Sequence, residues 1–265
     1  KNLTFAFDGL NQSLSALSFP VEIFEKCLII NRTNNINADK IKKISNIKFE
    51  NFKPLYLRSN AVISFWLFEN EKIFIIGESG IGKSSIFKSL LGYSEYEGNI
   101  YINNELLSIN SIANLFSWMP QDNHNIEGTI KFNLLLGNKH STEEEMRHIL
   151  KILRIEDKIN SIGGLNSNIE YQGKNFSGGE KQRLNLARSL LSNHPILLLD
   201  EPFSAIEENL EKEIYNIILN MKKTTIIISH NVKSIPDNSK ILYITKNNGF
   251  YYDEKIELIR KNILK

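Results

Sequence analysis

Cysteine is almost absent from this sequence, and other hallmarks of metal or nucleic-acid binding are absent with it. Cys27 is the only cysteine among 265 residues, which excludes an internal disulfide and a cysteine-based zinc cluster and is typical of a reducing compartment. The five histidines form no H-E-x-x-H or similar metal-binding pattern. The formal net charge is only +2, so no strong attraction to nucleic acid is expected.

Long apolar runs are also missing. No stretch approaches the roughly 20 residues that span a bilayer, and no signal-peptide pattern is present. The chain begins with Lys1 rather than methionine, so we expect it to be part of a longer protein.

The first thirty residues carry an apolar stripe at alternating spacings of four and three, which places its members on one face of a helix. Pro20 is expected to kink or interrupt that helix. The helix either packs on its own domain or is the end of a long helix from a bundle, and the sequence favours neither. The polar stretch 31–40 is then typical of a linker. The stripe consists of Leu3, Phe7, Leu10, Leu14, Leu17, Val21, Phe24 and Leu28.

Short β-rich apolar runs then alternate with helical patterns. We expect strands within residues 62–68, 72–77, 115–121, 195–202 and 224–230, and a hairpin turning at Asn103 and Asn104. We expect helices within residues 82–92, 141–154 and 207–223, the second opened by a capping box of Thr142 and Glu145. Short buried strands separated by helices predict a parallel α/β sheet.

One loop of this sheet has the composition of a phosphate-binding loop. Residues 77–85, GESGIGKSS, fit the pattern G-x-x-x-x-G-K-[ST] between a predicted strand and a predicted helix. The glycines let backbone N–H groups face a phosphate. Lys83 would reach the β- and γ-phosphates, and Ser84 would hold Mg²⁺.

A second predicted strand, ILLLDE, ends in two carboxylates. Asp200 is placed to bind Mg²⁺ through water, and Glu201 to take a proton from an attacking water. A helix cap would explain an apolar strand ending in Asp-Glu about as well. The phosphate-binding loop favours the catalytic interpretation.

A further anion site is predicted at the start of the helix NFSGGEKQRLNLAR, residues 175–188. Ser177 and Glu180 form an S-x-x-E capping box. Gly178 and Gly179 occupy the first turn, where each glycine costs roughly 1 kcal/mol against alanine. A bare helix N-terminus of this kind favours a phosphate, so the chain carries two predicted phosphate sites.

The phosphate-binding loop, FSGGE, LLLDEP and a strand ending at His230, in that order, resemble the nucleotide-binding domain of an ABC transporter, from about Ile47 onward. The resemblance implies a P-loop NTPase (RecA-like) α/β core with a mixed sheet, an antiparallel β subdomain and a helical signature subdomain. It implies two domains paired head to tail around two ATP molecules, each signature motif contacting the ATP held by the other domain's P-loop. It further implies that residues 204–208 cross the dimer interface.

The same resemblance implies roles residue by residue. Gln121 would touch Mg²⁺ and the attacking water, His230 the γ-phosphate, and Tyr56 would stack on adenine, although a core tyrosine explains Tyr56 as well. The expected catalytic residues are Lys83, Gln121, Glu201 and His230, and the expected Mg²⁺ residues are Ser84, Gln121 and Asp200. The expected ATP-binding residues are Tyr56, Gly77, Glu78, Ser79, Gly80, Ile81, Gly82, Lys83, Ser84, Ser85, Phe176, Ser177, Gly178, Gly179 and Glu180.

Four positions depart from the family pattern. Phe176 replaces leucine and Glu180 replaces glutamine in the signature, Glu207 replaces the aspartate of the crossing loop, and Asn70 replaces a turn glycine that asparagine can mimic. None of them affects Lys83, Asp200, Glu201 or His230, so an active ATPase is expected.

The stretch PQDNHNIEGTIKFNLLLG is similar to the exporter type, in which GTI-x-x-N follows the glutamine. This implies residues 1–40 as the cytoplasmic end of a last transmembrane helix with its linker, and 41–265 as the ATPase domain, with a helical subdomain at about 122–190. The implied partners are a second nucleotide-binding domain (the same chain or a close paralogue) and a fused membrane domain at the cytoplasmic face of the cell membrane, with no nucleic acid.

The sequence disfavours three alternatives. A free-standing importer ATPase subunit is disfavoured by the exporter-like EGTIKFN and the N-terminal stripe. A DNA-repair or chromosome-type ATPase would separate its P-loop and signature by a very long coiled coil, whereas residues 85–176 hold only a small helical lobe. A non-catalytic binding module is disfavoured by Glu201.

Overall fold

The computed structural model describes residues 44–106, 115–122, 125–170, 173–237 and 239–252. The predicted N-terminal helix and linker of residues 1–40 lie outside this range.

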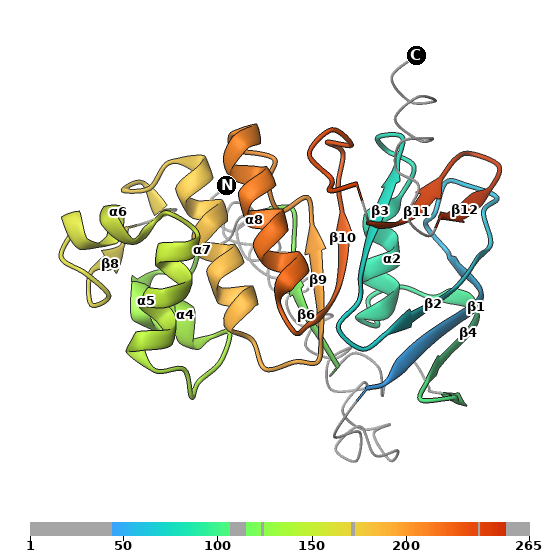
Figure 1. Ribbon diagram of the computed structural model, residues 1–265, viewed down its shortest axis with the longest axis horizontal. Coiled ribbons are helices and arrows are strands. Elements are labelled where there is room, and N and C mark those ends of the chain that lie inside the picture. Colours follow the sequence, from blue (N-terminus) through green and yellow to red (C-terminus); the bar gives the residue numbers. More distant parts are fainter. Residues whose placement is uncertain (1–43, 107–114, 123–124, 171–172, 238, 253–265) are drawn as a thin grey trace, which may run out of the picture.

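One end of the molecule is a small antiparallel sheet (Figure 1). Its strands are β1 (Asn46–Pro54), β2 (Ile63–Phe68), β4 (Tyr96–Ile102) and β5 (Glu105–Leu106), in the order β2-β1-β4-β5. Asn103 and Asn104 join the last two at φ 52° and 67°, the left-handed values that a tight hairpin turn needs. The predicted hairpin is therefore confirmed.

The centre is a six-stranded mixed sheet in the order β12-β11-β3-β10-β9-β6. The strands β11, β3, β10, β9 and β6 pair in parallel, and β12 is an antiparallel edge strand. This confirms the predicted parallel core and adds one antiparallel strand. The bounds are β3 (Lys72–Gly77), β6 (Phe116–Met119), β9 (Ile196–Asp200), β10 (Thr224–Ile228), β11 (Lys240–Ile244) and β12 (Gly249–Tyr252).

Among the residues that the structure describes, three helices pack on this sheet and three lie in a lobe at the end opposite the antiparallel sheet (Figure 1). The sheet helices are α2 (Lys83–Leu90), α7 (Gly178–Leu191) and α8 (Glu208–Asn220). The lobe contains α4 (Ile130–Leu135), α5 (Glu143–Ile152) and α6 (Glu156–Ser161), with the short pair β7 (Gly128–Thr129) and β8 (Asn168–Ile169). The predicted capping box of Thr142 and Glu145 opens α5.

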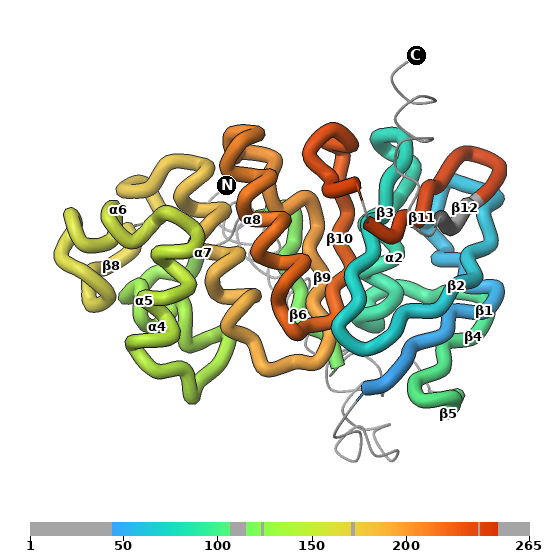
Figure 2. Tube along the Cα trace, in the orientation of Figure 1, coloured from blue at the N-terminus to red at the C-terminus, as the bar shows by residue number. Residues whose placement is uncertain are grey.

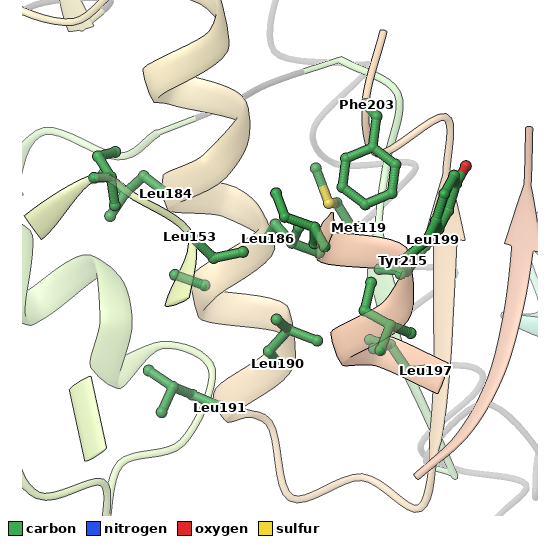
Figure 3. Packing of buried hydrophobic residues seen from close by; sticks show 14 of the residues in the cluster. Met119, Leu153, Leu184, Leu186, Leu190, Leu191, Leu197, Leu199, Phe203 and Tyr215 are labelled. Carbon is green, nitrogen blue, oxygen red and sulfur yellow. The ribbon is translucent and has the colours of Figure 1, made fainter. Parts of the chain in front are cut away.

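Alternating side chains of the buried strands divide the interior into two cores. Ile73 and Ile75 of β3 face the core shared with α2 and the antiparallel sheet. Phe74 and Ile76 face the core shared with α7 and α8, in which Leu197 of β9 lies near these helices (Figure 3). Both faces of a parallel sheet are thus covered, and burial of each large apolar side chain stabilises the fold by about 1.5–3 kcal/mol.

The direction of the strands positions the site. Because β3, β9 and β10 run in parallel, their carboxyl ends reach one edge of the sheet, where ligands bind in folds of this class. At that edge the chain passes into the loop after β3, the turn after β9 and the loop after β10 (Figure 2).

Candidate active site

The loop after β3 wraps around the amino group of Lys83. The Lys83 Nζ atom donates to the carbonyl oxygens of Gly77 and Glu78, each at 2.9 Å. Burial lowers the pKa of Lys83, and the nearby carboxylates of Glu201 and Asp200 oppose that shift. The cation is therefore held at the mouth of the loop by backbone oxygens.

Gly82 shows why this loop needs glycine. Its φ is +98°, and a Cβ there would lie 2.6 Å from the carbonyl oxygen of Tyr56. Any other residue would collide with backbone, so Gly82 allows the segment that carries Tyr56 to lie against the phosphate-binding loop.

Asp200, at the end of β9, is 2% exposed and accepts a hydrogen bond from Ser84 Oγ at 3.2 Å. Burial raises the pKa of Asp200 to about 6, against the opposing effect of the Ser84 hydrogen bond. A buried carboxylate whose charge is not fully compensated, beside a hydroxyl, is a donor set that suits a hard divalent cation such as Mg²⁺. Within the part of the chain that the structure describes, no group of three His, Cys, Asp or Glu residues forms another metal site.

Glu201 brings together two residues that are distant in sequence. Its Oε2 atom accepts a hydrogen bond from Gln121 Nε2 at 2.9 Å, and its Oε1 atom contacts His230 Nε2. Its backbone is in the left-handed region, with φ +49°, and its N–H donates to Ile228 O at 3.0 Å. Three of the predicted catalytic residues thus meet at one point.

These groups line a cleft of about 1130 Å³. Tyr56 lies on its wall and the residue is 66% exposed, so the alternative that Tyr56 is a core residue is wrong. The predicted residues that line the cleft are Tyr56, Ser79, Gly80, Gly82, Lys83, Ser84, Ser85, Gln121, Glu201 and His230.

The predicted signature, residues 176–180, contributes nothing to the lining of this cleft. The capping box at the start of α7 is confirmed, because Ser177 Oγ accepts from Glu180 N at 3.2 Å and Glu180 Oε2 accepts from Ser177 N at 2.7 Å. Ser177 and Gly178 are exposed. The second predicted phosphate site therefore lies outside the cleft that contains the first.

The two glycines of α7 are not equivalent. A Cβ on Gly179 would lie 2.6 Å from the carbonyl oxygen of Ala205, whereas a Cβ on Gly178 would meet only the Ala205 Cβ at 4.0 Å. Close packing of backbone against backbone therefore requires Gly179, which the sequence did not indicate.

The departures from the family pattern have local explanations. Phe176 is buried, and Lys158 Nζ lies 5.7 Å from the centre of its ring. Asn70 has φ +65°, as expected for a substitute of a turn glycine. Glu207 is the exposed N-cap residue of α8 and makes no side-chain capping hydrogen bond.

Sequence reasoning missed two buried amides. Gln182 of α7 is fully buried and hydrogen-bonds to Glu201, Ser204 and Ala205. Asn133 of α4 bonds Ile126 N at 2.9 Å, Ile126 O at 2.7 Å and Thr129 O at 3.1 Å, which explains the asparagine of GTI-x-x-N. The available signal was a polar residue on the apolar face of a helix.

A phosphate-binding loop, a buried aspartate and a glutamate at the carboxyl edge of a parallel sheet define a P-loop NTPase. The family model described as ABC transporter matches residues 61–204, more than half of the chain. The chain belongs to the ABC transporter family and corresponds to its ATP-binding, ATP-hydrolysing domain.

Individual relatives agree with this assignment. The chain is 36% identical to an export ATP-binding/permease protein of Rickettsia bellii over 91% of this chain and 45% of that protein. It is 32% identical to the mitochondrial iron-sulfur clusters transporter ABCB7 of Oryzias latipes over 76% of this chain and 28% of that protein. A solved bacterial Atm1-family ABC exporter with ATP bound is 28% identical, with a TM-score of 0.72, over 83% of this chain and 41% of that chain.

The chain spans less than half the length of the export ATP-binding/permease proteins that it matches. Among the residues that the structure describes, no helix is both long enough and apolar enough to cross a bilayer.

Proposed function

We propose that this chain is the ATP-hydrolysing motor of an ABC exporter. The observation that carries the proposal is the meeting of Gln121, Glu201 and His230 beside the phosphate-binding loop. The similarity to export ATP-binding/permease proteins supports export over import. The motor works at the cytoplasmic face of a membrane, joined to a membrane domain of the kind that those relatives contain.

In the proposed reaction, water attacks the γ-phosphorus of ATP while its proton passes to the Glu201 carboxylate, and the bond to ADP breaks. A positioned base of this kind accelerates a reaction by about 10²–10⁴-fold. Gln121 and His230, which both contact the Glu201 carboxylate, orient it toward the phosphate end of the cleft. Lys83 offsets the negative charge of the phosphates.

Ser84, Asp200 and Gln121 are the residues that would hold Mg²⁺. The ion would neutralise phosphate charge as the bond to ADP breaks. The raised pKa of Asp200, caused by burial, supports this assignment because a cation would relieve the cost of the buried carboxylate.

Two copies act as a head-to-tail pair. Residues 176–180 of one copy complete the site formed by the P-loop of the other. Two observations support pairing: the cleft takes no residue from the signature, and the N-terminus of α7 presents Ser177 and Gly178 to the surrounding water, where a helix N-terminus favours an anion.

The test is the variant Glu201→Gln, which keeps the size of the side chain but cannot accept the proton. We expect turnover to fall by about 10²–10⁴-fold with ATP affinity unchanged. We also expect an ATP-dependent dimer on size exclusion. Hydrolysis at the wild-type rate would show that Glu201 is not the base.

The matched control is Ser177→Arg, which places a bulky cation at the start of α7. We expect this variant to bind ATP with wild-type affinity and to form no dimer. Loss of ATP binding to the monomer would contradict the paired model, because the signature would then belong to the same ATP as Lys83.

A further inference from the structure

The side chain of Gln182 has hydrogen-bond partners for both ends of its amide. It is 0% exposed on α7, one turn beyond the capping box. Its Nε2 atom donates to Glu201 O and to Ser204 Oγ, each at 3.0 Å. Its Oε1 atom accepts from Ala205 N at 2.9 Å. Because a buried amide without partners is costly, these three bonds determine its orientation.

The hydrogen bond from Gln182 to Glu201 O holds a residue that has an uncommon backbone conformation. Glu201 has φ +49°, a region that L-residues other than glycine, asparagine and aspartate seldom occupy. Its N–H is held by Ile228 O of β10 and its C=O by Gln182 of α7. Since the side chain projects from the Cα between these two peptide groups, they set where the carboxylate points.

The same segment also touches α7 at Gly179, where only a hydrogen fits beneath the carbonyl oxygen of Ala205. The first two turns of α7 therefore contact Glu201, Ser204 and Ala205 directly. Residues 204–208 are the predicted interface loop, and the start of α7 is the predicted site for a partner's phosphate.

We propose that Gln182 is a positioning residue that couples the two ATP sites of the pair through one chain. This inference rests on the proposed function. ATP in a second copy's P-loop contacts the start of α7, and Gln182 transmits a displacement of α7 to the backbone of this chain's own Glu201. The Glu201 carboxylate, already held by Gln121 and His230, is then aligned with the attacking water only when the opposite site is filled.

Such a link is a coupling free energy between sites, and it appears as cooperativity. The rate of hydrolysis should depend on ATP concentration with a Hill coefficient above one in the wild-type dimer. A side chain that fills the same space without hydrogen bonds should remove that dependence and leave the phosphate-binding loop intact.

The test compares Gln182→Met and Gln182→Glu in the purified chain, at concentrations where the Glu201→Gln variant is dimeric with ATP. Methionine has a similar size and makes none of the three bonds. Glutamate can accept from Ala205 N but cannot donate to Glu201 O. For both we expect ATP affinity within about twofold of wild type, kcat lower by about tenfold or more and a Hill coefficient of one.

A readout independent of turnover uses the double variant Gln182→Met with Glu201→Gln. It should still form the ATP-dependent dimer on size exclusion, because Gln182 contacts neither nucleotide nor partner in the proposal. If Gln182→Met does not fold, Gln182→Glu decides the result alone.

Asn133→Leu provides the matched control. Asn133 is another buried amide with three backbone hydrogen bonds, but in the helical lobe. We expect its loss to lower the melting temperature and leave kcat and the Hill coefficient unchanged.

Wild-type kcat and cooperativity in both Gln182 variants would overturn the inference while the proposed function stands, and so would a wild-type Hill coefficient of one. A wild-type chain that hydrolyses no ATP would instead overturn the proposed function.

Discussion

Asp200 is a buried and Lys223 a partly buried ionisable residue, at opposite edges of the same sheet. Asp200 ends β9 and Lys223 precedes β10, which runs parallel to it. Burial raises the pKa of Asp200 to about 6 and lowers the pKa of Lys223 to about 8. Asp200 has a proposed cation to neutralise it, whereas the Lys223 Nζ atom donates to the carbonyl oxygen of Ser192. At the scale of single residues, the charge of Asp200 would serve the proposed reaction, whereas the charge of Lys223 costs stability.

Lys223→Met tests that cost. The folded chain binds the Lys223 proton less tightly than the unfolded chain, so between about pH 8 and 10.5 the wild-type free energy of unfolding rises with pH. Below pH 8 the lowered pKa of Lys223 costs the wild-type chain about 3 kcal/mol of stability. Lys223→Met removes this cost but also loses the hydrogen bond to Ser192, which contributes about 1 kcal/mol.

We expect the variant to be more stable than wild type by about 2 kcal/mol at pH 7.5 and the difference to shrink toward pH 10. Urea denaturation of both proteins at the two pH values measures it. A difference that does not change with pH would contradict the assigned shift.

At the scale of elements, α7 combines a stable helix with an exposed, glycine-rich start. Leu184, Leu186 and Leu190 bury its apolar side in the core shared with α8 and β9 (Figure 3). Its first turn carries the capping box and, at Gly179, the close contact with Ala205. The packed helix therefore connects an exposed N-terminus to the backbone of Glu201.

The two glycines of α7 make a matched pair of variants. Gly178→Ala should stabilise the nucleotide-free chain by up to about 1 kcal/mol, because alanine favours the helix and finds open space. Gly179→Ala should destabilise it by about 1–3 kcal/mol, since the Ala205 carbonyl must move. Urea denaturation compares them. Equal effects would mean that the contact with Ala205 is not close in solution.

At the scale of the whole molecule, each chain of the proposed pair would carry two half-sites. The cleft holds Lys83, Glu201 and His230, and the signature lies outside it. A single copy therefore lacks the phosphate contacts that the proposed pair supplies. Nothing in this arrangement requires the isolated chain to be a stable dimer.

The rate per chain should therefore depend on concentration. At saturating ATP we expect the isolated wild-type chain to be largely monomeric and its specific activity to rise with protein concentration. Ser177→Arg should show low activity that does not vary with concentration. Equal specific activity for the two proteins across a dilution series would contradict pairing.

The local sequence was sufficient to predict the α/β core, the hairpin at Asn103 and Asn104, and both capping boxes. These features depend on the chemistry of neighbouring residues and on the period of apolar side chains, which are local properties. The strand ILLLDE and the phosphate-binding loop indicated Glu201, and the resemblance to a family added Gln121 and His230. The fold brings the three together.

The sequence could not reveal that Gln182 hydrogen-bonds to Glu201, nor that Gly179 packs against the carbonyl oxygen of Ala205. The bond between Gln121 and Glu201 joins residues 80 positions apart, and the strand order that places β6 beside β9 brings these residues within reach of each other. Local sequence determines which elements form and where they begin and end. Only the packing of distant elements determines which polar groups meet, because such contacts depend on strand order and helix position and leave no periodic trace in the chain.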